Sequence, residues 1–204
     1  MKQYRGCSRL VYAVITETES GTTYGEVKTL APVKSVSVDL SSEKEDVYAD
    51  NTLQQTTYGA STRVRTFDCT RIAPEVVAEL LGNTTIAVGD KHAYATDPSG
   101  SNRPYIAVGY ALHDGDVDRP CELVWAFKGK VNSISQTSST MDSGTGSEGQ
   151  SVEVEFVAPK GKFTTTNKRN LDIAIAYDSE SAFEVEDWFK QVITPDNITS
   201  ILMA

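Results

Sequence analysis

Residues 152–156 read Val-Glu-Val-Glu-Phe, and apolar and acidic side chains alternate along this stretch without a break. Successive side chains of a β-strand point to opposite faces, so the alternation predicts a strand with one buried and one solvent-facing side. The same period of two recurs in residues 10–15, 36–40, 106–112 and 171–177. Trp125 and Phe127 give a further strand, residues 123–127, a heavy aromatic face. This set of strands is enough for two packed sheets or a barrel.

One strong helix signal interrupts the strands. Pro74 suits a first helical position, and Gly82-Asn83 is a strong stop. The apolar residues between them form one stripe, which is expected to lie on a sheet: Val76, Val77, Leu80 and Leu81. A weaker helix is predicted for residues 181–192, ended by Pro195. The predicted fold class is therefore mainly β (α+β): a two-sheet β-sandwich or barrel with one flanking α-helix and a short C-terminal helix.

Two long polar segments are predicted to be extended loops of a single domain that spans residues 1–204. The first, residues 41–62, is acidic and has an apolar character only around Val47 and Tyr48. The second, residues 132–150, is rich in Ser, Thr and Gly and has almost no apolar residues. Loops of this length are uncommon in compact domains unless they are functional or disordered.

The charge balance and the cysteines narrow the class of protein. The formal net charge is -9, and an acidic surface repels phosphate backbones, so ordinary nucleic-acid binding is disfavoured. Three widely spaced cysteines do not form a disulfide framework and fit a reducing compartment. The apolar run at residues 10–15 is about half the length of a signal-peptide core. We therefore expect synthesis in a cytoplasm, and no segment is long and apolar enough to span a bilayer.

A search for catalytic and ligand-binding motifs gives little. His113 is followed by Asp114, Asp116 and Asp118, but Arg119 stands where a calcium loop needs glycine, so an acidic turn is the favoured reading. Residues 144–149 match GxGxxG without the strand and helix that a dinucleotide site requires. Trp125 and Trp188 are expected to be core or interface anchors. We expect no enzymatic activity, no catalytic residue, no metal site and no cofactor.

The order of these elements resembles the major tail protein, or tail tube protein, of long-tailed siphophages. The likeness covers residues 10 to 190 and depends on the succession of segments, since no single motif is diagnostic. The segments that carry it are residues 10–15, 43–51, 62–67, 74–82, 103–110 and 121–128.

The resemblance implies a structural virion protein located in the tail and assembled in the host bacterial cytoplasm. Six copies would close into a ring, and rings would stack into a tube that conducts the genome. The implied partners are other copies of the chain, a tape measure protein and other tail proteins; DNA would pass through without specific binding, and no membrane would be involved.

Two sets of residues are candidates for these roles. The expected contact between stacked rings is the acidic segment, with Glu43, Glu45, Asp46, Tyr48 and Asp50. Glu153 and Glu155 are candidates for an acidic lumen wall, and an ordinary solvent-exposed sheet face is the alternative. The rival function is an immunoglobulin-like adhesion module on a virion or cell surface, although such domains usually run nearer 100 residues.

Overall fold

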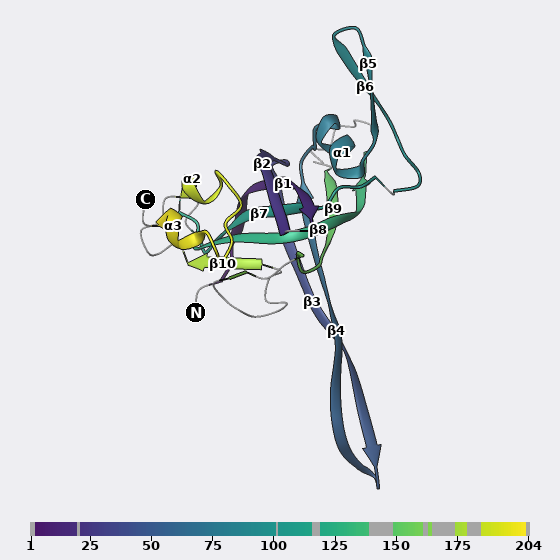
Figure 1. Cartoon of the computed structure of the whole chain (residues 1–204), viewed down its shortest axis with the longest axis vertical. Coiled ribbons are helices and arrows are strands. Elements are labelled where there is room, and N and C mark those ends of the chain that lie inside the picture. Colours follow the sequence, from purple (N-terminus) through teal and green to yellow (C-terminus); the bar gives the residue numbers. More distant parts are fainter. Residues whose placement is uncertain are drawn as a thin grey trace, which may run out of the picture.

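The computed structural model describes residues 3–19, 21–100, 102–115, 119–138, 149–160, 163–164, 174–178 and 185–202, with only the backbone at 43, 60–62, 176, 178 and 202. Its strands are β1 Gly6–Thr18, β2 Gly21–Thr29, β3 Val33–Ala49, β4 Thr52–Cys69, β5 Thr84–Val88, β6 Lys91–Ala95, β7 Ile106–His113, β8 Glu122–Gln136, β9 Gln150–Phe156 and β10 Ala174–Asp178 (Figure 1). The helices are α1 Pro74–Leu81, α2 Val185–Trp188 and α3 Ile198–Leu202. The fold is mainly β with short helices, which confirms the predicted class.

Eight strands form one antiparallel sheet that curls into two facing layers. Its order is β2-β1-β7-β8-β9-β4-β3. The remaining strand, β10, pairs with residues 122–126 of β8, and β9 pairs with residues 129–136 of β8 along the same edge. In a flat sheet β1 and β3 would be five strand spacings apart, about 24 Å. Their Cα atoms instead approach within 8 Å, so the two halves of the sheet face each other. This is the sandwich arrangement that the strand pattern predicts.

The middle of the sheet is buried on both faces. One face packs into a core between the two layers, with Tyr12, Phe67 and Val154 among its members. The other face carries Trp125 and Phe127, and the C-terminal segment that includes Trp188 and Ile193 covers it. Seven of the eight residues of β7 are consequently buried. The alternation in this strand reflects two packed faces, not the half-exposed strand that its sequence pattern predicts.

The helix α1 begins and ends as predicted. Pro74 occupies the first turn, and Gly82 adopts a left-handed conformation with φ of 68°. The amide of Asn83 donates to the carbonyl of Ala78 at 2.8 Å, which satisfies a free carbonyl at the helix end. Leu80 is fully buried in the core between the layers, so the predicted apolar stripe does lie on the sheet.

The prediction of an extended loop at residues 41–62 is wrong. This segment is the outer part of a long antiparallel hairpin made by β3 and β4, with pairs from Val33↔Cys69 to Ala49↔Thr52. Its strands lack a buried face, so the apolar alternation that marks a strand is absent even though the backbone ladder forms. Threonines and tyrosines, which suit an extended backbone, maintain the strand conformation there.

The second predicted loop is shorter than expected, and only part of the predicted C-terminal helix is described as a helix. Residues 132–136 belong to β8 and residue 150 to β9, so the strands extend into both ends of the segment 132–150. Residues 139–148 lie outside the described residues, as do 171–173 and 181–184 of the predicted strand and helix. The helix predicted for residues 181–192 is described only as the single turn Val185–Trp188.

Candidate functional site

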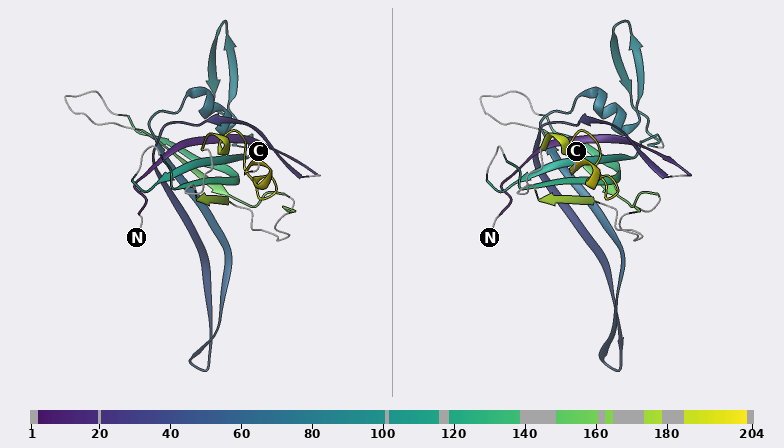
Figure 2. Two further views of the ribbon diagram at one scale, coloured as in Figure 1. Left: turned by 90° about the vertical axis from the view of Figure 1, so that its left-hand side faces the viewer. Right: turned by 60° about the vertical axis from the view of Figure 1, so that its left-hand side comes forward.

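The most prominent feature of the molecule is a two-stranded arm. β4 pairs with β9 only from Val64 to Cys69, so residues 40–63, which we call the arm, extend beyond the sheet as a bare hairpin. At about 3.3 Å per residue, the ten residues from Leu40 to Ala49 reach roughly 30 Å. Figure 1 and Figure 2 show the arm leaving the body along the long axis of the molecule.

The tip of the arm is a tight two-residue turn. Asp50 and Asn51 have φ angles of 52° and 59°, and the flanking residues Ala49 and Thr52 pair directly. Two consecutive left-handed residues are the requirement of a type I′ turn, whose twist matches that of the flanking strands, and Asp and Asn tolerate this conformation. The turn therefore fixes the register of the arm from its end.

One face of the arm carries large apolar side chains. Tyr48 pairs with Leu53, and Tyr58 lies further along the same face, opposite Lys44. Their exposed fractions are 66% for Tyr48, 47% for Leu53 and 67% for Tyr58. An isolated hairpin is only marginally stable in water, and exposed apolar groups of this size mark interaction surfaces when they gather. We name Tyr48, Leu53 and Tyr58 the arm cluster.

An acidic group sits within this apolar face. Asp46 accepts hydrogen bonds from Lys44 at 2.7 Å and from Thr56 at 2.7 Å. These two bonds lower the pKa of Asp46, so its carboxylate is charged at neutral pH. The arm therefore presents aromatic rings and negative charge together.

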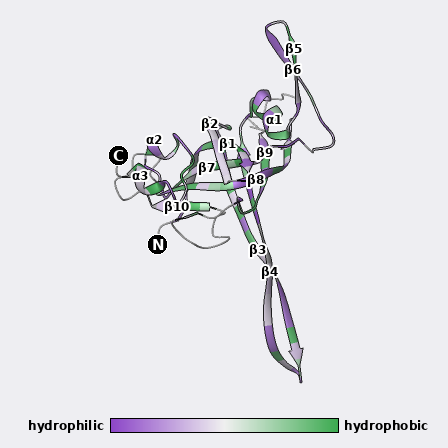
Figure 3. Ribbon diagram, viewed as in Figure 1, coloured by the Kyte–Doolittle hydropathy of each residue, from purple (hydrophilic) through white to green (hydrophobic). Residues whose placement is uncertain are grey.

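All five predicted contact residues lie on the arm in the structure. Glu45, Tyr48 and Asp50 are exposed, and Asp46 is half-buried. Glu43 belongs to β3, but its side chain lies outside the described part of the structure. In Figure 3 hydrophilic and hydrophobic residues both occur along the arm. Leu53 and Tyr58, which the sequence reasoning did not single out, complete the face.

The second predicted pair, Glu153 and Glu155, lies on the outer face of β9. Directly paired residues share a face, so the register places these two carboxylates in rows that cross four strands. The rows contain Lys130-Glu155-Val64-Asp39, Ser133-Glu153-Thr66-Ser37 and Ser135-Ser151-Asp68-Ser35. We call these positions the polar face. Four carboxylates and one lysine leave it with a net charge of -3 (4 minus 1).

Hydrogen bonds keep one of these carboxylates ionised. Ser35 donates to Asp68 at 2.6 Å, and this bond, with a second from Ser151, lowers the pKa of Asp68. Asn132 donates its amide to Glu153. Lys130 lies opposite Glu155 and approaches the ring of Tyr105 at 5.3 Å, so the negative charge is partly balanced at that corner.

A second hairpin, β5–β6, projects from the opposite end of the molecule (Figure 1, Figure 2). All five residues of β5 are exposed, including Ile86 at 48% and Val88 at 61%. Its base adjoins α1, and a hollow of about 460 Å³ lies there between α1, β6 and the adjoining ends of β8 and β9. The molecule therefore has an exposed hairpin at each end of its long axis.

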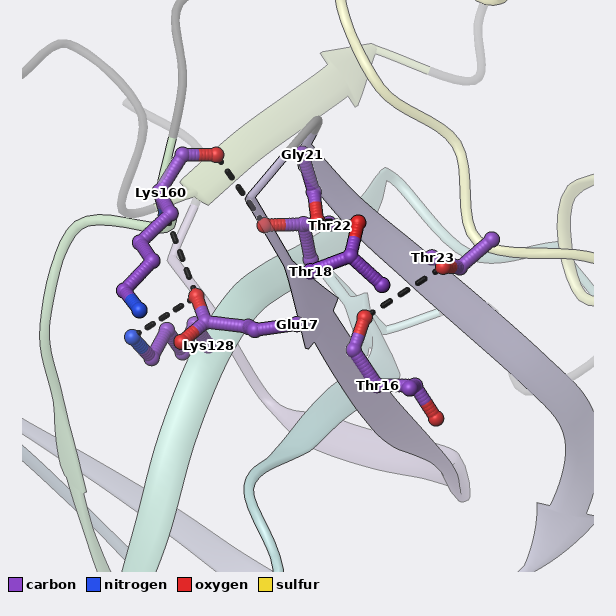
Figure 4. Close-up of polar contacts among 8 residues, drawn as sticks. All are labelled: Thr16, Glu17, Thr18, Gly21, Thr22, Thr23, Lys128 and Lys160. Carbon is purple, nitrogen blue, oxygen red and sulfur yellow. Dashed lines mark hydrogen bonds and ion pairs between the residues drawn. The ribbon is translucent and has the colours of Figure 1, made fainter.

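A buried ion pair connects three segments of the body. Lys128 lies 2.9 Å from Glu17, and their side chains are only 8% and 12% exposed. Glu17 also accepts the backbone amide of Lys160 at 3.1 Å, and Thr22 donates to the carbonyl of Lys160 at 3.1 Å (Figure 4). Burial opposes the charge of Glu17, but the bonds from Lys128 and Lys160 outweigh it, and the pKa of Glu17 is lowered.

The two histidines occupy different environments. His113 is buried, and its Nε2 lies 2.8 Å from the hydroxyl of Ser8. His92 is exposed on β6. Asp116 and Asp118 of the predicted acidic turn lie outside the described residues.

The described residues carry neither a metal cluster nor a membrane-spanning helix. Among them, no three or more His, Cys, Asp or Glu side chains gather where they would hold a metal ion. Cys7, Cys69 and Cys121 are free thiols. No helix in the described ranges has both the length and the apolar character needed to cross a bilayer.

Comparison with known proteins finds matches among solved structures alone. No family model matches the chain, and no curated protein matches it. Among solved structures, a chain of the sheath–tube complex of an extracellular contractile injection system (PVC) in its extended state aligns with a TM-score of 0.44 and 12% identity. The alignment covers 84% of this chain and 89% of that chain. At this degree of similarity, function has to be inferred from the geometry of the chain itself.

Proposed function

We propose that this protein is a structural subunit that assembles with copies of itself into a tube, as a tail tube protein of a siphophage does. The arm carries this proposal. It places Tyr48 and Leu53 roughly 30 Å beyond the sheet and Tyr58 roughly half as far, where no other described segment covers them. A bare hairpin is only marginally stable in water, and a second copy of the chain would bury its exposed apolar side chains.

The two ends of the molecule carry different hairpins, so copies that meet end to end join unlike surfaces. The arm projects from one end and β5–β6 from the other (Figure 1). Contacts between unlike surfaces are heterologous, so they close into rings or continue into filaments. Rings, with six copies as the resemblance implies, would use lateral contacts, and stacking would use the axial ends. The sheet edges at β2 and β3 are available for lateral pairing.

The polar face fits the wall of a conduit. Its carboxylates and hydroxyls, with a net charge of -3, would repel a phosphate backbone and let DNA pass without specific binding. We propose that Glu153 and Glu155 belong to this wall, in a virion tail where the tape measure protein and other tail proteins are further partners. The role is structural, and we propose no catalytic activity.

Deleting residues 43–58 is expected to abolish tube formation and to leave the body folded. Ser42 and Ser61 pair directly, so the deletion joins them through Gly59-Ala60, a two-residue turn with glycine first, as a type II′ hairpin requires. Negative-stain microscopy of the purified variant and of the unaltered chain, over a range of concentrations, measures assembly. Circular dichroism and thermal unfolding measure the fold.

Normal tubes from the deletion variant would contradict the assigned role of the arm. An unaltered chain that stays monomeric at every concentration and salt, and that binds a glycan or a cell surface, would favour the adhesion module instead. The variant Asn51→Gly serves as a control and is expected to form tubes, because glycine satisfies the left-handed turn and keeps the arm in place.

A further inference from the structure

We propose that the hollow at the base of β5–β6 is the receptor for the arm of a second copy of this chain. The inference rests on the proposed function and deepens it by naming both sides of the axial contact. We call the hollow the socket; its lining includes Arg71, Ile72, Val77, Tyr94, Gln136 and Gln150.

The positions of the arm and the socket fit a head-to-tail contact. The socket lies beside α1 and β6, at the end of the body opposite to the arm (Figure 1). Moving one copy along the long axis of the molecule therefore brings its arm toward the socket of the next copy. An arm of roughly 30 Å is long enough to cross a gap between bodies and still overlap the neighbour.

The chemistry of the two surfaces is complementary. The socket offers apolar contact from Ile72, Val77 and Tyr94, and its volume of about 460 Å³ is enough for one or two large side chains. The arm cluster presents Tyr48 and Leu53 as the side chains nearest to the tip. Gln150 and Gln136 line the same hollow; Gln150 donates to Gln136 at 3.1 Å and accepts the amide of Ile72 at 2.6 Å, and the amide NH₂ group of Gln136 is able to donate to a tyrosine hydroxyl.

Charge selects this socket over the neighbouring hollow. Arg71 is exposed, and among the described residues that line the socket it is the only ionised one. The tip of the arm carries Asp46 and Asp50. A second hollow, which shares Asn83 and Tyr94 with the socket, is lined by Glu75, Glu79 and Lys28, so its net charge is -1 (1 minus 2) and it would repel the same tip. In a chain with 28 acidic and 19 basic residues, a socket whose only charge is positive suits an acidic arm.

Reversing the charge of Arg71 tests the contact. Arg71→Glu is expected to raise the protein concentration needed for tube assembly at least tenfold, because it sets a carboxylate against Asp46 and Asp50. Arg119→Glu makes the same change at another exposed arginine, in the connection between β7 and β8, and is expected to assemble like the unaltered chain. Light scattering and negative-stain microscopy measure assembly, and thermal unfolding of both variants checks the fold.

A photo-crosslinking experiment locates the contact independently of charge. Benzoylphenylalanine in place of Tyr48 is expected, in assembled tubes, to crosslink to peptides of a second copy that contain residues 70–77, 94, 136 or 150. The same probe in place of Tyr4, an exposed tyrosine near the N-terminus, is expected to give a different set of peptides.

The outcomes separate the two proposals. Tubes that form normally from Arg71→Glu, or crosslinks from position 48 that fall outside the socket, overturn the receptor assignment and leave the tube proposal standing. An unaltered chain that forms no polymer at any concentration overturns the tube proposal and the receptor assignment with it.

Discussion

Replacing Trp188 by alanine is expected to lower the free energy of unfolding by about 3–5 kcal/mol. Trp188 is fully buried, its ring packs against that of Tyr177 at 5.6 Å between centroids, and its carbonyl accepts the indole N–H of Trp125 at 2.9 Å. Truncation leaves a large cavity between the C-terminal segment and the sheet. Since whole domains have stabilities of about 5–15 kcal/mol, this single change removes a large share of the total.

Denaturant titration followed by circular dichroism measures this effect. Ile86→Ala, at an exposed position of β5, is the control and is expected to change the stability by at most about 0.5 kcal/mol. Trp188→Phe keeps most of the ring volume and is expected to lose less than the alanine variant. A loss below about 1 kcal/mol for Trp188→Ala would mean that the C-terminal segment does not belong to the core that the structure shows.

The sequence predicts those elements whose residue pattern matches the burial that they have in the fold. α1 is bounded by a proline and a glycine that act through the backbone alone, so its ends can be read without knowing what it packs against. β9 faces a core on one side and solvent on the other, and its alternating apolar and acidic residues predict this arrangement. In both elements the residue pattern reports the physical environment directly.

The sequence pattern does not predict the strands of the arm, because neither face of the arm is buried in the subunit. Strand prediction relies on a contrast between a buried and an exposed side, and Glu45, Val47 and Tyr48 give no such contrast. The remaining signal was the pair Asp50-Asn51, which suits a type I′ turn between threonine-rich strands. β5 and β6 were missed for the same reason, since their residues are almost all exposed.

The candidate site combines residues that only the fold brings together. Asp39, Asp68 and Glu153 are far apart in the sequence, and the strand order places them on one sheet face. Arg71 and Gln136 become neighbours in the socket because α1 and β6 sit at one end of β8 and β9. A charge count gives the sign of the whole chain but not which face holds the carboxylates.

The ion pair between Glu17 and Lys128 is expected to show the second large effect. Lys128→Met leaves the Glu17 carboxylate buried without its cation, and breaking a buried pair typically costs about 3–5 kcal/mol. We expect a value of about 3 kcal/mol, because Glu17 lies close to the turn between β1 and β2, where water can enter after the substitution. The double variant Glu17→Leu/Lys128→Met is expected to recover most of the loss, since no unpaired charge remains.

The pH dependence of Lys128→Met provides a check that a purely steric defect would not reproduce. In the unaltered chain the folded-state pKa of Glu17 is lowered, so this carboxylate adds stability above its unfolded pKa, and the contribution disappears as the pH falls through the folded value. In Lys128→Met the bond and charge of Lys128 no longer oppose burial, and only those of Lys160 remain, so the pKa of Glu17 rises above its value in the unaltered chain and protonation relieves the unpaired charge. The deficit in unfolding free energy should therefore shrink between pH 7 and about pH 4. Lys190→Met, which breaks an exposed pair with Asp187, should show a small deficit in comparison. A Lys128→Met deficit equally large at both pH values would contradict the ion-pair account.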